Sequence, residues 1–394
     1  MQTDLNYLPV EILHDILTYI IHGSKERLNI LCVNSLFHSV ALRILHQDLL
    51  FTSASQLMRF AGYIYHILLA GDPENDGHGK LNDLVCEPQT LTLELAGGTA
   101  FTLVTPIGGI AGFGTATCPL SIFECLHEAL SQLARHPKAR MDSNGKHILE
   151  TLYLRLNSHS IEKRCYNVYD AFVLVNPRRF IWVGPDPPHH FSIAIVPNAV
   201  PSLFEALSTY TRLTYLKLTN IAFPTLAASD VLSTVFSSLS LSSNSGSESS
   251  IDYIRLPVIP SLRTLYLGQT TFLSAPSIAS LILNTVRYSE HDDDANAGRK
   301  DPQSTTSTTR AQLERVHLVD AYEGSIWGLR LRMPHIVTAA LFLTEHPEYS
   351  DGYEGRLEPG GGDKTLRERV KDTVENMVLV EVKTERIMGG DRGS

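Results

Sequence analysis

The chain has 394 residues, of which 43% are hydrophobic and 19% are charged, and its formal net charge is −9. These proportions are those of a globular protein, not a disordered one, and the length allows two or three domains or one array of repeated units. The acidic balance argues against a general nucleic-acid-binding protein, which would carry a basic face, so we expect no nucleic-acid partner.

The start of the chain and its cysteines bear on the cellular compartment. Residues 1–10 lack a basic start, and no apolar core with a small-residue cleavage site follows, so we expect no secretory signal. The most apolar predicted helix, residues 57–70, is interrupted by Arg59 and His66 and is too short to span a bilayer. The five cysteines form no Cys-x-x-Cys pair. We therefore expect a cytoplasmic or nuclear protein with free thiols and no membrane partner.

The first fifty residues predict three short helices. Pro9 suits the first turn of a helix, because its missing N–H would be unpaired there anyway. Apolar residues then recur at helical spacing, namely Ile12, Leu13, Ile16, Leu17 and Ile20. Gly23 ends this helix, a second helix follows, and a third opens near Asn34 or Ser35. Three such helices bury little surface alone, so the module must pack on a partner or on the rest of the chain.

This N-terminal pattern resembles the F-box. The matching residues occur in the family's order and spacing: Leu8-Pro9-x-Glu11-Ile12-Leu13, Ile16-Leu17-x-Tyr19-Ile20, Leu31-Cys32-Val33-Asn34, Phe37 and Leu45. F-box proteins dock on the Skp adaptor of a cullin-type ubiquitin ligase, so the resemblance implies a Skp-type adaptor and, through it, a cullin as partners. The adaptor-binding residues that it implies are Leu8, Pro9, Ile12, Leu13, Ile16, Leu31 and Phe37. The alternative is a helical cap that merely seals a larger core.

The rest of the chain alternates predicted strands with predicted helices. Four strands share the pattern Leu-x-x-Leu-x-Leu or one close to it, at residues 149–154, 213–218, 262–267 and 313–318. Weaker strands are predicted at 91–95, 180–183 and 378–382, and helices at 121–134, 202–208, 229–239, 276–286, 334–344 and 366–376. Such recurrence is typical of a leucine-rich solenoid, in which each unit buries its apolar face against its neighbours.

The spacing of the copies is too long for a regular array. The second apolar positions of the four copies are Leu152, Leu216, Leu265 and Val316. The separation between successive copies is therefore about twice the length of a standard repeat, which is roughly 20–29 residues. Either each unit carries a long insertion, or degenerate units such as the strand around Trp182 lie between the clear ones. A doubly wound α/β domain is the competing architecture, because βαβ units alternate in the same way.

The sequence therefore predicts an α/β protein in which an N-terminal three-helix F-box, residues 1–50, precedes an irregular leucine-rich-repeat-like domain, residues 51–394, of strand–helix units with a parallel sheet. Flexible insertions are expected near residues 237–250, 288–310 and 350–363, which are rich in Ser, Gly, Asp or Thr. An F-box followed by a degenerate leucine-rich array resembles the large F-box families of mushroom-forming fungi.

Signatures of catalysis are scarce. The glycines between Gly108 and Gly114 do not follow the order of a phosphate-binding loop, and the adjacent His189 and His190 lack the spacing of a metal-binding pair. Asp292 to Asp294 lack the alternating ligands of a calcium loop. We therefore expect no enzyme, no cofactor and no metal. An enzyme with an unfamiliar site near the Gly108 loop is the weakest alternative.

A solenoid presents a surface for recognition. If the strand leucines point inward, the intervening residues line the exposed sheet. Those residues are Tyr153, Arg155, Trp182, Tyr215, Lys217, Tyr266, Arg315 and His317, and Tyr, Trp and Arg are enriched at binding hot spots. We expect a non-catalytic substrate-recognition subunit that holds an unknown protein target for ubiquitin transfer, or, alternatively, a leucine-rich scaffold with no ligase role.

Overall fold

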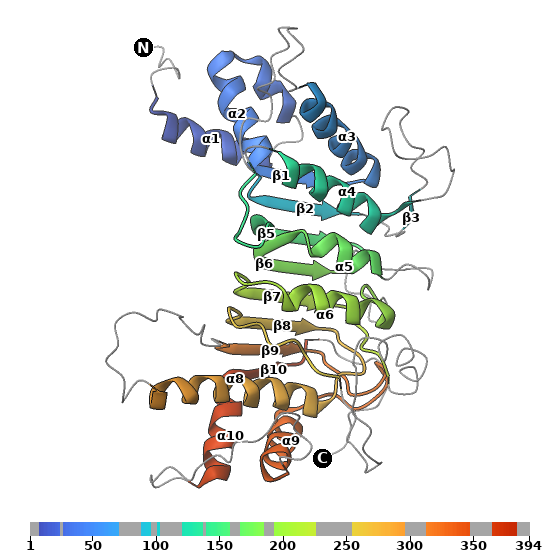
Figure 1. Ribbon diagram of the computed structural model, residues 1–394, viewed down its shortest axis with the longest axis vertical. Helices are drawn as coiled ribbons and strands as arrows, with labels where there is room; N and C mark the ends of the chain where they lie inside the picture. The colour runs from blue at the N-terminus through green and yellow to red at the C-terminus, as the bar shows by residue number, and fades with distance from the viewer. Residues whose placement is uncertain are drawn as a thin grey trace. The chain divides into compact units, whose positions relative to one another are not determined.

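The computed structural model describes residues 8–23, 27–70, 88–95, 101–102, 120–136, 139–157, 166–184, 193–225, 254–295, 313–346 and 365–383. The fold is α/β, with an eight-stranded parallel sheet whose strands alternate with helices (Figure 1). The strands are β1 (Asp48–Phe51), β2 (Thr90–Glu94), β5 (His147–Arg155), β6 (Val175–Val183), β7 (Tyr215–Thr219), β8 (Thr264–Gly268), β9 (Arg315–Val319) and β10 (Val378–Glu381).

The helical elements are α1 (Val10–Gly23), η2 (Arg27–Cys32), α2 (Ser35–Gln47), α3 (Ala54–Ala70), α4 (Ile122–Arg135), α5 (Tyr166–Phe172), η3 (Pro197–Ala199), α6 (Val200–Ser208), α8 (Ala275–Ala295), α9 (Met333–Glu345) and α10 (Leu366–Met377), where η marks a 3-10 helix. A separate antiparallel pair consists of β3 (Phe101–Thr102) and β4 (Leu120–Ser121). None of the helices in the described ranges is both long and apolar enough to cross a membrane.

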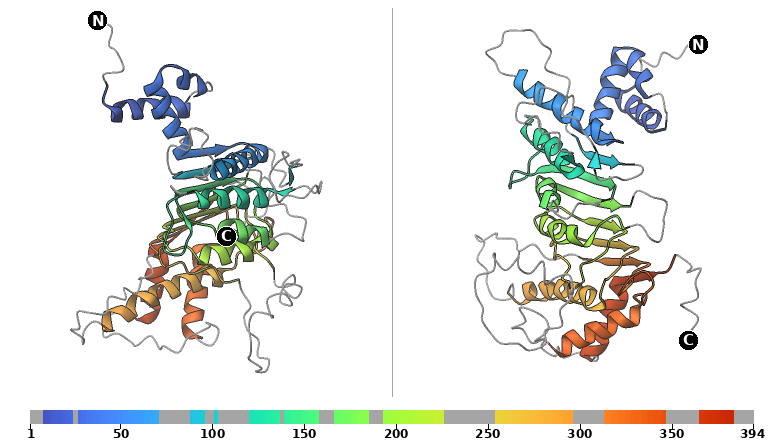
Figure 2. Two further views of the ribbon diagram at one scale, coloured as in Figure 1. Left: turned by 45° about the horizontal axis from the view of Figure 1, so that its top comes forward. Right: turned by 90° about the vertical axis from the view of Figure 1, so that its right-hand side faces the viewer.

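The order of the strands decides between the two predicted architectures. The sheet runs β1-β2-β5-β6-β7-β8-β9-β10, so its strands follow one another in chain order. A doubly wound sheet reverses its order at a switch point, which this sheet does not do. In the right-hand view of Figure 2, the green α5 and yellow-green α6 lie on one side of their strands. This arrangement is compatible with a strand–helix solenoid.

Most of the predicted elements are confirmed, each with ends shifted by a few residues. All seven predicted strands after residue 50 are present. The second predicted N-terminal helix is a 3-10 helix, η2. α8 continues to Ala295, into the first part of the insertion predicted near 288–310, and residues 296–310 lie outside the described residues. The predicted helix at 229–239, the insertions at 237–250 and 350–363, the Gly108 loop and His189–His190 lie outside the described residues.

The chain divides into two compact units. Unit 1 comprises Met1–Leu95, Phe101–Leu154 and Leu174–Pro177, and unit 2 comprises Ala96–Ala100, Arg155–Val173 and Arg178–Ser394. Within unit 1, α2 ends at Gln47 and β1 begins at the next residue. The N-terminal helices therefore lead into the sheet without a linker, and residue 50, the predicted domain boundary, lies inside β1.

The N-terminal helices of unit 1 share one small core. Its buried members, drawn from α1 and α2, are Leu13, Leu17, Ile21, Phe37, Val40, Ala41 and Ile44, and Ile30, Leu31, Leu36 and Leu45 pack against them. The Asn34 side chain accepts a hydrogen bond of 2.8 Å from the Phe37 backbone N–H, which fixes the start of α2. The predicted helix start near Asn34 is confirmed.

A buried histidine opens β5 in the same unit. The His147 side chain is fully buried, and neither ring nitrogen has a hydrogen-bond partner among the described residues. Burial disfavours the charged imidazolium and lowers the pKa of His147 from 6.5 to about 4. The folded chain therefore holds this imidazole neutral at pH values where the unfolded chain protonates it.

We expect His147 to make stability fall by about 3 kcal/mol as the pH drops from 6.5 to about 4. Above pH 6.5 the imidazole is neutral in both states, and the full stability is present. As the pH falls from 6.5 to about 4, the unfolded state takes up a proton that the folded state does not, so stability is lost. Urea unfolding across this range measures it. His147→Leu should flatten the pH dependence by that amount, and His127→Gln, on α4, should leave it in place. Equal slopes for His147→Leu and the unaltered chain would refute the assignment.

The core of unit 2 is built around a cluster of aromatic rings. The Trp182 side chain is 0% exposed, and its Nε1–H donates a 3.0 Å hydrogen bond to the Leu156 carbonyl oxygen. Its ring packs edge-on against Phe172 at a centroid distance of 5.7 Å, and Phe172 packs in the same way against Phe180. The prediction that Trp182 lines the exposed sheet is therefore wrong. Phe180 and Trp182 point inward, as Leu216 and Leu218 do in the register of β7.

Three successive strands of unit 2 end in the same backbone corner. Asn220, Gln269 and Asp320 directly follow β7, β8 and β9, and all three have positive φ, at 57°, 49° and 49°. Each donates its backbone N–H to the carbonyl of the last residue of the next strand, at 2.7–3.0 Å. Repeated left-handed corners that stack in this way show that the three repeats that contain β7, β8 and β9 are structurally equivalent.

Candidate interaction surfaces

An apolar stripe lies on the outer face of α1 in unit 1. Ile12, Ile16, Tyr19 and Ile20 are 48%, 39%, 83% and 38% exposed. Their spacing of four, three and one residues places them within about 100° of the helix circumference. The adjoining arc of the same helix, which carries Leu13, Leu17 and Ile21, is buried in the core shared with α2. The apolar arc of α1 is therefore wider than the part that packs inside the unit.

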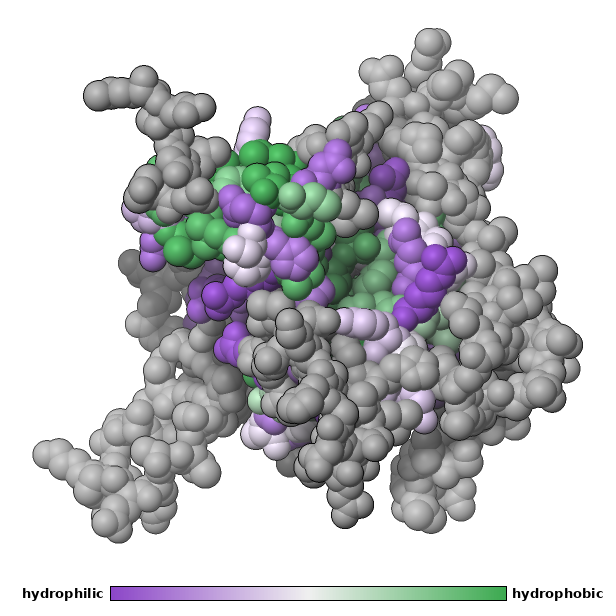
Figure 3. Space-filling view, turned by 90° about the horizontal axis from the view of Figure 1, so that it is seen from above, coloured by the Kyte–Doolittle hydropathy of each residue, from purple (hydrophilic) through white to green (hydrophobic). Residues whose placement is uncertain are grey.

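Figure 3 looks onto the N-terminal helices from above and shows apolar surface, in green, gathered at this end of unit 1. Val10 and Val33 add to the exposed apolar residues of the N-terminal segment, at 54% and 60%. Isolated exposed apolar side chains are common on protein surfaces, but a contiguous group marks an interaction site more often. The outer face of α1 is the clearest candidate of this kind in unit 1.

The structure separates the predicted adaptor-binding residues into two groups. Pro9, Ile12 and Ile16 are exposed, and Leu8 is half-buried at the start of α1. Leu13 and Phe37 are buried in the helical core, and Leu31 packs against that core. Leu13 and Phe37 therefore hold the helices together, and their side chains are not available to a partner. Tyr19, Ile20 and Val33 were not among the predicted docking residues.

The second candidate surface is the open face of the sheet in unit 2. The parallel register aligns Ile181, Lys217, Tyr266, His317 and Leu379 in one row across β6 to β10. A second row consists of Arg179, Tyr215, Thr264 and Arg315. The residues between these positions are the buried apolar ones. The two rows therefore lie on the face opposite the core.

Cations and aromatic rings are paired across the strands of this face. The Arg179 guanidinium lies 5.3 Å from the centre of the Tyr215 ring, and the Lys217 Nζ lies 4.7 Å from the centre of the Tyr266 ring. The Tyr266 ring in turn meets His317 edge-on at 4.8 Å. Gly268 leaves room for this arrangement, because a Cβ there would come within 3.0 Å of the Tyr266 ring.

The face is partly desolvated, and this shifts the pKa values of its titratable groups. Burial raises the pKa of Tyr215 and of Tyr266, so both phenols stay protonated at neutral pH. Burial, helped by the nearby Lys383, lowers the pKa of Lys217. Glu381 Oε2 lies 3.2 Å from both Lys383 Nζ and His317 Nε2. The contact with Lys383 is the main reason why the pKa of Glu381 is lowered.

Of the predicted target-binding residues, the structure brings Tyr215, Lys217, Tyr266, Arg315 and His317 together on this face. Trp182 is in the core. Tyr153 and Arg155 are half-buried on β5, and Tyr153 belongs to unit 1. Arg179 and Ile181 are the β6 residues that face outward, where Trp182 was expected. The sequence does not show this, because all four residues from Phe180 to Val183 are apolar and alternation therefore cannot tell which of them face outward.

Sequence reasoning also missed an exposed tryptophan. Trp327 is 62% exposed at the tip of a short hairpin closed by an antiparallel bridge between Tyr322 and Arg330. The Gly328 N–H donates to the Ser325 carbonyl at 2.7 Å, which makes the tip a tight turn. The only sequence signal is a tryptophan with a glycine beside it, which does not distinguish an exposed position from a buried one.

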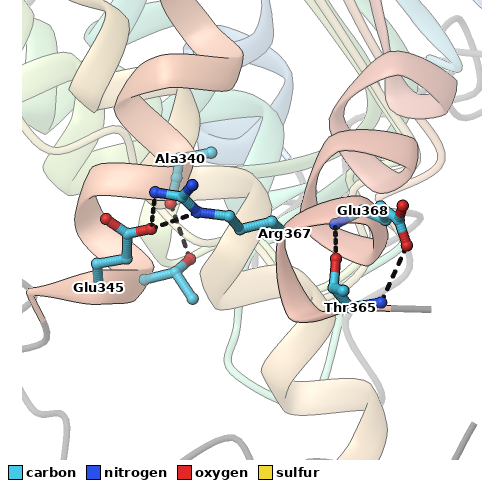
Figure 4. Close-up of polar contacts among 6 residues, drawn as sticks. Ala340, Glu345, Thr365, Arg367 and Glu368 are labelled. Atoms are coloured by element: carbon cyan, nitrogen blue, oxygen red, sulfur yellow. Dashed lines mark hydrogen bonds and ion pairs between the residues drawn. The ribbon is translucent and has the colours of Figure 1, made fainter. Parts of the chain in front are cut away.

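The last strand of this face is held in place by α9 and α10. Figure 4 shows the contact between them: Arg367 Nη2 and Nε approach Glu345 Oε1 at 2.6 and 2.7 Å. Thr365 and Glu368 cap the start of α10 reciprocally, at 3.3 and 3.0 Å. Since α10 ends at Met377 and β10 begins at Val378, these contacts position the strand that carries Glu381.

No family model, curated protein or solved structure is significantly similar to this chain. A function therefore has to be inferred from the two surfaces themselves. The stripe on α1 is apolar and helical, and the face of unit 2 is cationic and aromatic. Both have the composition of protein-interaction surfaces.

Groups that could carry chemistry are sparse in the described ranges. These residues contain no cluster of three or more His, Cys, Asp or Glu side chains that could hold a metal ion. Cys32 and Cys125 are free thiols. Burial raises the pKa of the Cys125 thiol to about 12, which keeps it from forming a thiolate at neutral pH.

Proposed function

We propose that this chain is the substrate-recognition subunit of an SCF-type (Skp–cullin–F-box) ubiquitin ligase. The exposed stripe of Ile12, Ile16, Tyr19 and Ile20 is the observation that supports the proposal most strongly. A helical cap that only sealed the array would bury this face, whereas a docking helix keeps it free for its partner. The residues that match the F-box pattern run through the same helix.

The array after the F-box is, in this proposal, an irregular set of leucine-rich repeats. The four Leu-x-x-Leu-x-Leu segments correspond to β5, β7, β8 and β9, and the last three of these end in the same stacked corner. Their leucines fill the core, and the intervening residues face outward. Such an array presents a broad surface for a protein target.

The chain itself needs no catalytic residue for this role. It would hold the target near a ubiquitin carrier that other subunits supply, and the rate would rise because tethering increases the effective concentration of the target's lysines. The Skp-type adaptor, bound through α1, would connect the chain to the cullin.

Co-purification with a purified Skp-type adaptor tests this role. We expect the intact chain to form a one-to-one complex that also recruits the cullin, and Leu8→Ala/Pro9→Ala to weaken it, since both residues directly precede α1. Failure of the intact chain to bind the adaptor would contradict the ligase role and would leave a leucine-rich scaffold.

A further inference from the structure

The open face of unit 2 carries an excess of positive charge, although the chain as a whole is acidic. Arg179, Lys217 and Arg315 lie on the outward positions of β6, β7 and β9. Within strands β6 to β10, the one carboxylate on this face is Glu381, and Lys383 already pairs with it. The neighbouring Asp320 is buried and accepts a hydrogen bond from the Lys383 backbone N–H.

The cations are held in defined positions. Arg179 and Lys217 lie over the rings of Tyr215 and Tyr266, which reduces their freedom to turn toward solvent. The two phenols stay protonated, so each offers an O–H donor beside a cation. A surface that combines fixed cations with hydroxyl donors is suited to carboxylates.

The spacing of the cations points to an extended ligand. Neighbouring strands lie about 4.8 Å apart, so the three steps from Arg179 on β6 to Arg315 on β9 cover roughly 14 Å. An extended chain covers this distance in about four residues, and its alternate side chains project to the same side. Acidic residues at every second position would therefore meet the cationic face together.

We propose that the open face of β6 to β9 binds an extended acidic segment of the target protein. This inference rests on the proposed function, because it names the chemistry of the target, but it makes no use of the adaptor-binding helix. A protein segment fits better than a nucleic acid, because the face carries three cations spread over β6 to β9 and not the dense cluster of Lys and Arg that a nucleic-acid-binding domain shows.

Fluorescence anisotropy on the full chain tests the inference. The probe is a labelled peptide of about ten residues in which glutamate alternates with serine, compared with the same peptide carrying glutamine for glutamate. We expect the glutamate peptide to bind at least about tenfold more tightly, and its binding to weaken between about 0.05 M and about 0.5 M salt. Equal binding of the two peptides, or no binding of either, would overturn the inference.

Variants locate the peptide on the face. Arg179→Gln/Lys217→Gln/Arg315→Gln should weaken binding by at least about 20-fold, whereas Lys371→Gln should change it less than about twofold. Lys371 is a matched control because it is an exposed lysine of α10 that pairs with Glu375 at 3.8 Å, away from the sheet face. An equal loss in both variants would show unspecific attraction and contradict the assignment.

Two further outcomes separate this inference from its alternatives. Tighter binding of a single-stranded oligonucleotide than of the glutamate peptide would assign the face to nucleic acid and overturn the proposal. A chain that binds the adaptor but not the peptide would contradict the acidic target alone. A chain that binds the peptide but not the adaptor would contradict the ligase role alone.

Discussion

Ile12→Ala/Ile16→Ala is expected to lower the affinity of the chain for a Skp-type adaptor by at least ~100-fold. Both side chains belong to the exposed stripe of α1, and truncating a central apolar contact of an interface costs about 2 kcal/mol or more. Neither residue belongs to the helical core, so the fold should be retained. Calorimetric titration of the purified adaptor into the full chain measures the loss, and circular dichroism checks the fold.

Two controls separate docking from packing. Leu329→Ala removes an apolar side chain that is exposed in unit 2, and it should leave adaptor affinity unchanged. Leu13→Ala removes a buried member of the helical core and should cost about 2–5 kcal/mol of stability. The docking surface is misassigned if Ile12→Ala/Ile16→Ala keeps its affinity within about threefold, or if Leu329→Ala loses as much.

Trp182→Ala is expected to destabilise unit 2 by about 4–6 kcal/mol. Truncating a buried tryptophan costs about 3–5 kcal/mol, and the Leu156 carbonyl would lose the hydrogen bond from the indole N–H. The rings of Phe172 and Phe180 would also face a cavity. Urea unfolding followed by far-ultraviolet circular dichroism measures the change in the free energy of unfolding.

Tyr266→Ala provides the matched comparison from the other face of the sheet. Its ring is half-buried and contacts Lys217 and His317, so its removal should cost only about 1 kcal/mol. If Trp182→Ala were as mild as Tyr266→Ala, the inward placement of Trp182 would be contradicted, and the original expectation that it lines the recognition face would return.

Strands with alternating leucines could be located from sequence because the physical signal is local. In β7, β8 and β9 the apolar positions alternate with Tyr, Lys, Arg, Thr or His, so both the strand and its inward face follow from the pattern. The same holds for α4, which is predicted at 121–134 and observed at Ile122–Arg135, where Ser121 and Glu124 form a reciprocal cap.

Other features depend on contacts that no local pattern encodes. β1 follows α2 without a turn signal, and it forms a strand because Leu49 and Phe51 are buried as it pairs with β2. The phase of β6 is set by its pairing with β7, since its last four residues, Phe180 to Val183, are apolar on both faces. α8 continues past the predicted limit into Asp292 to Asp294, where apolar periodicity has already ended.

The candidate docking helix shows the same limit at the level of single residues. Ile12, Leu13, Ile16, Leu17 and Ile20 all fit a helical repeat. Which of them face outward is decided by α2, whose buried residues share one core with Leu13 and Leu17. The sequence indicates an amphipathic helix, but only the packing of α2 shows which part of its apolar arc remains exposed.

A site-specific cross-link from Tyr19 tests the docking role of α1 most directly. Tyr19 is 83% exposed at one edge of the stripe, so a photoreactive phenylalanine derivative placed there should not disturb the core. After irradiation with the Skp-type adaptor, we expect a covalent one-to-one product from this position and none from the same group placed at Leu329. Adaptor binding without a cross-link from residue 19, or equal cross-linking from both positions, would contradict the assignment of this face to the adaptor.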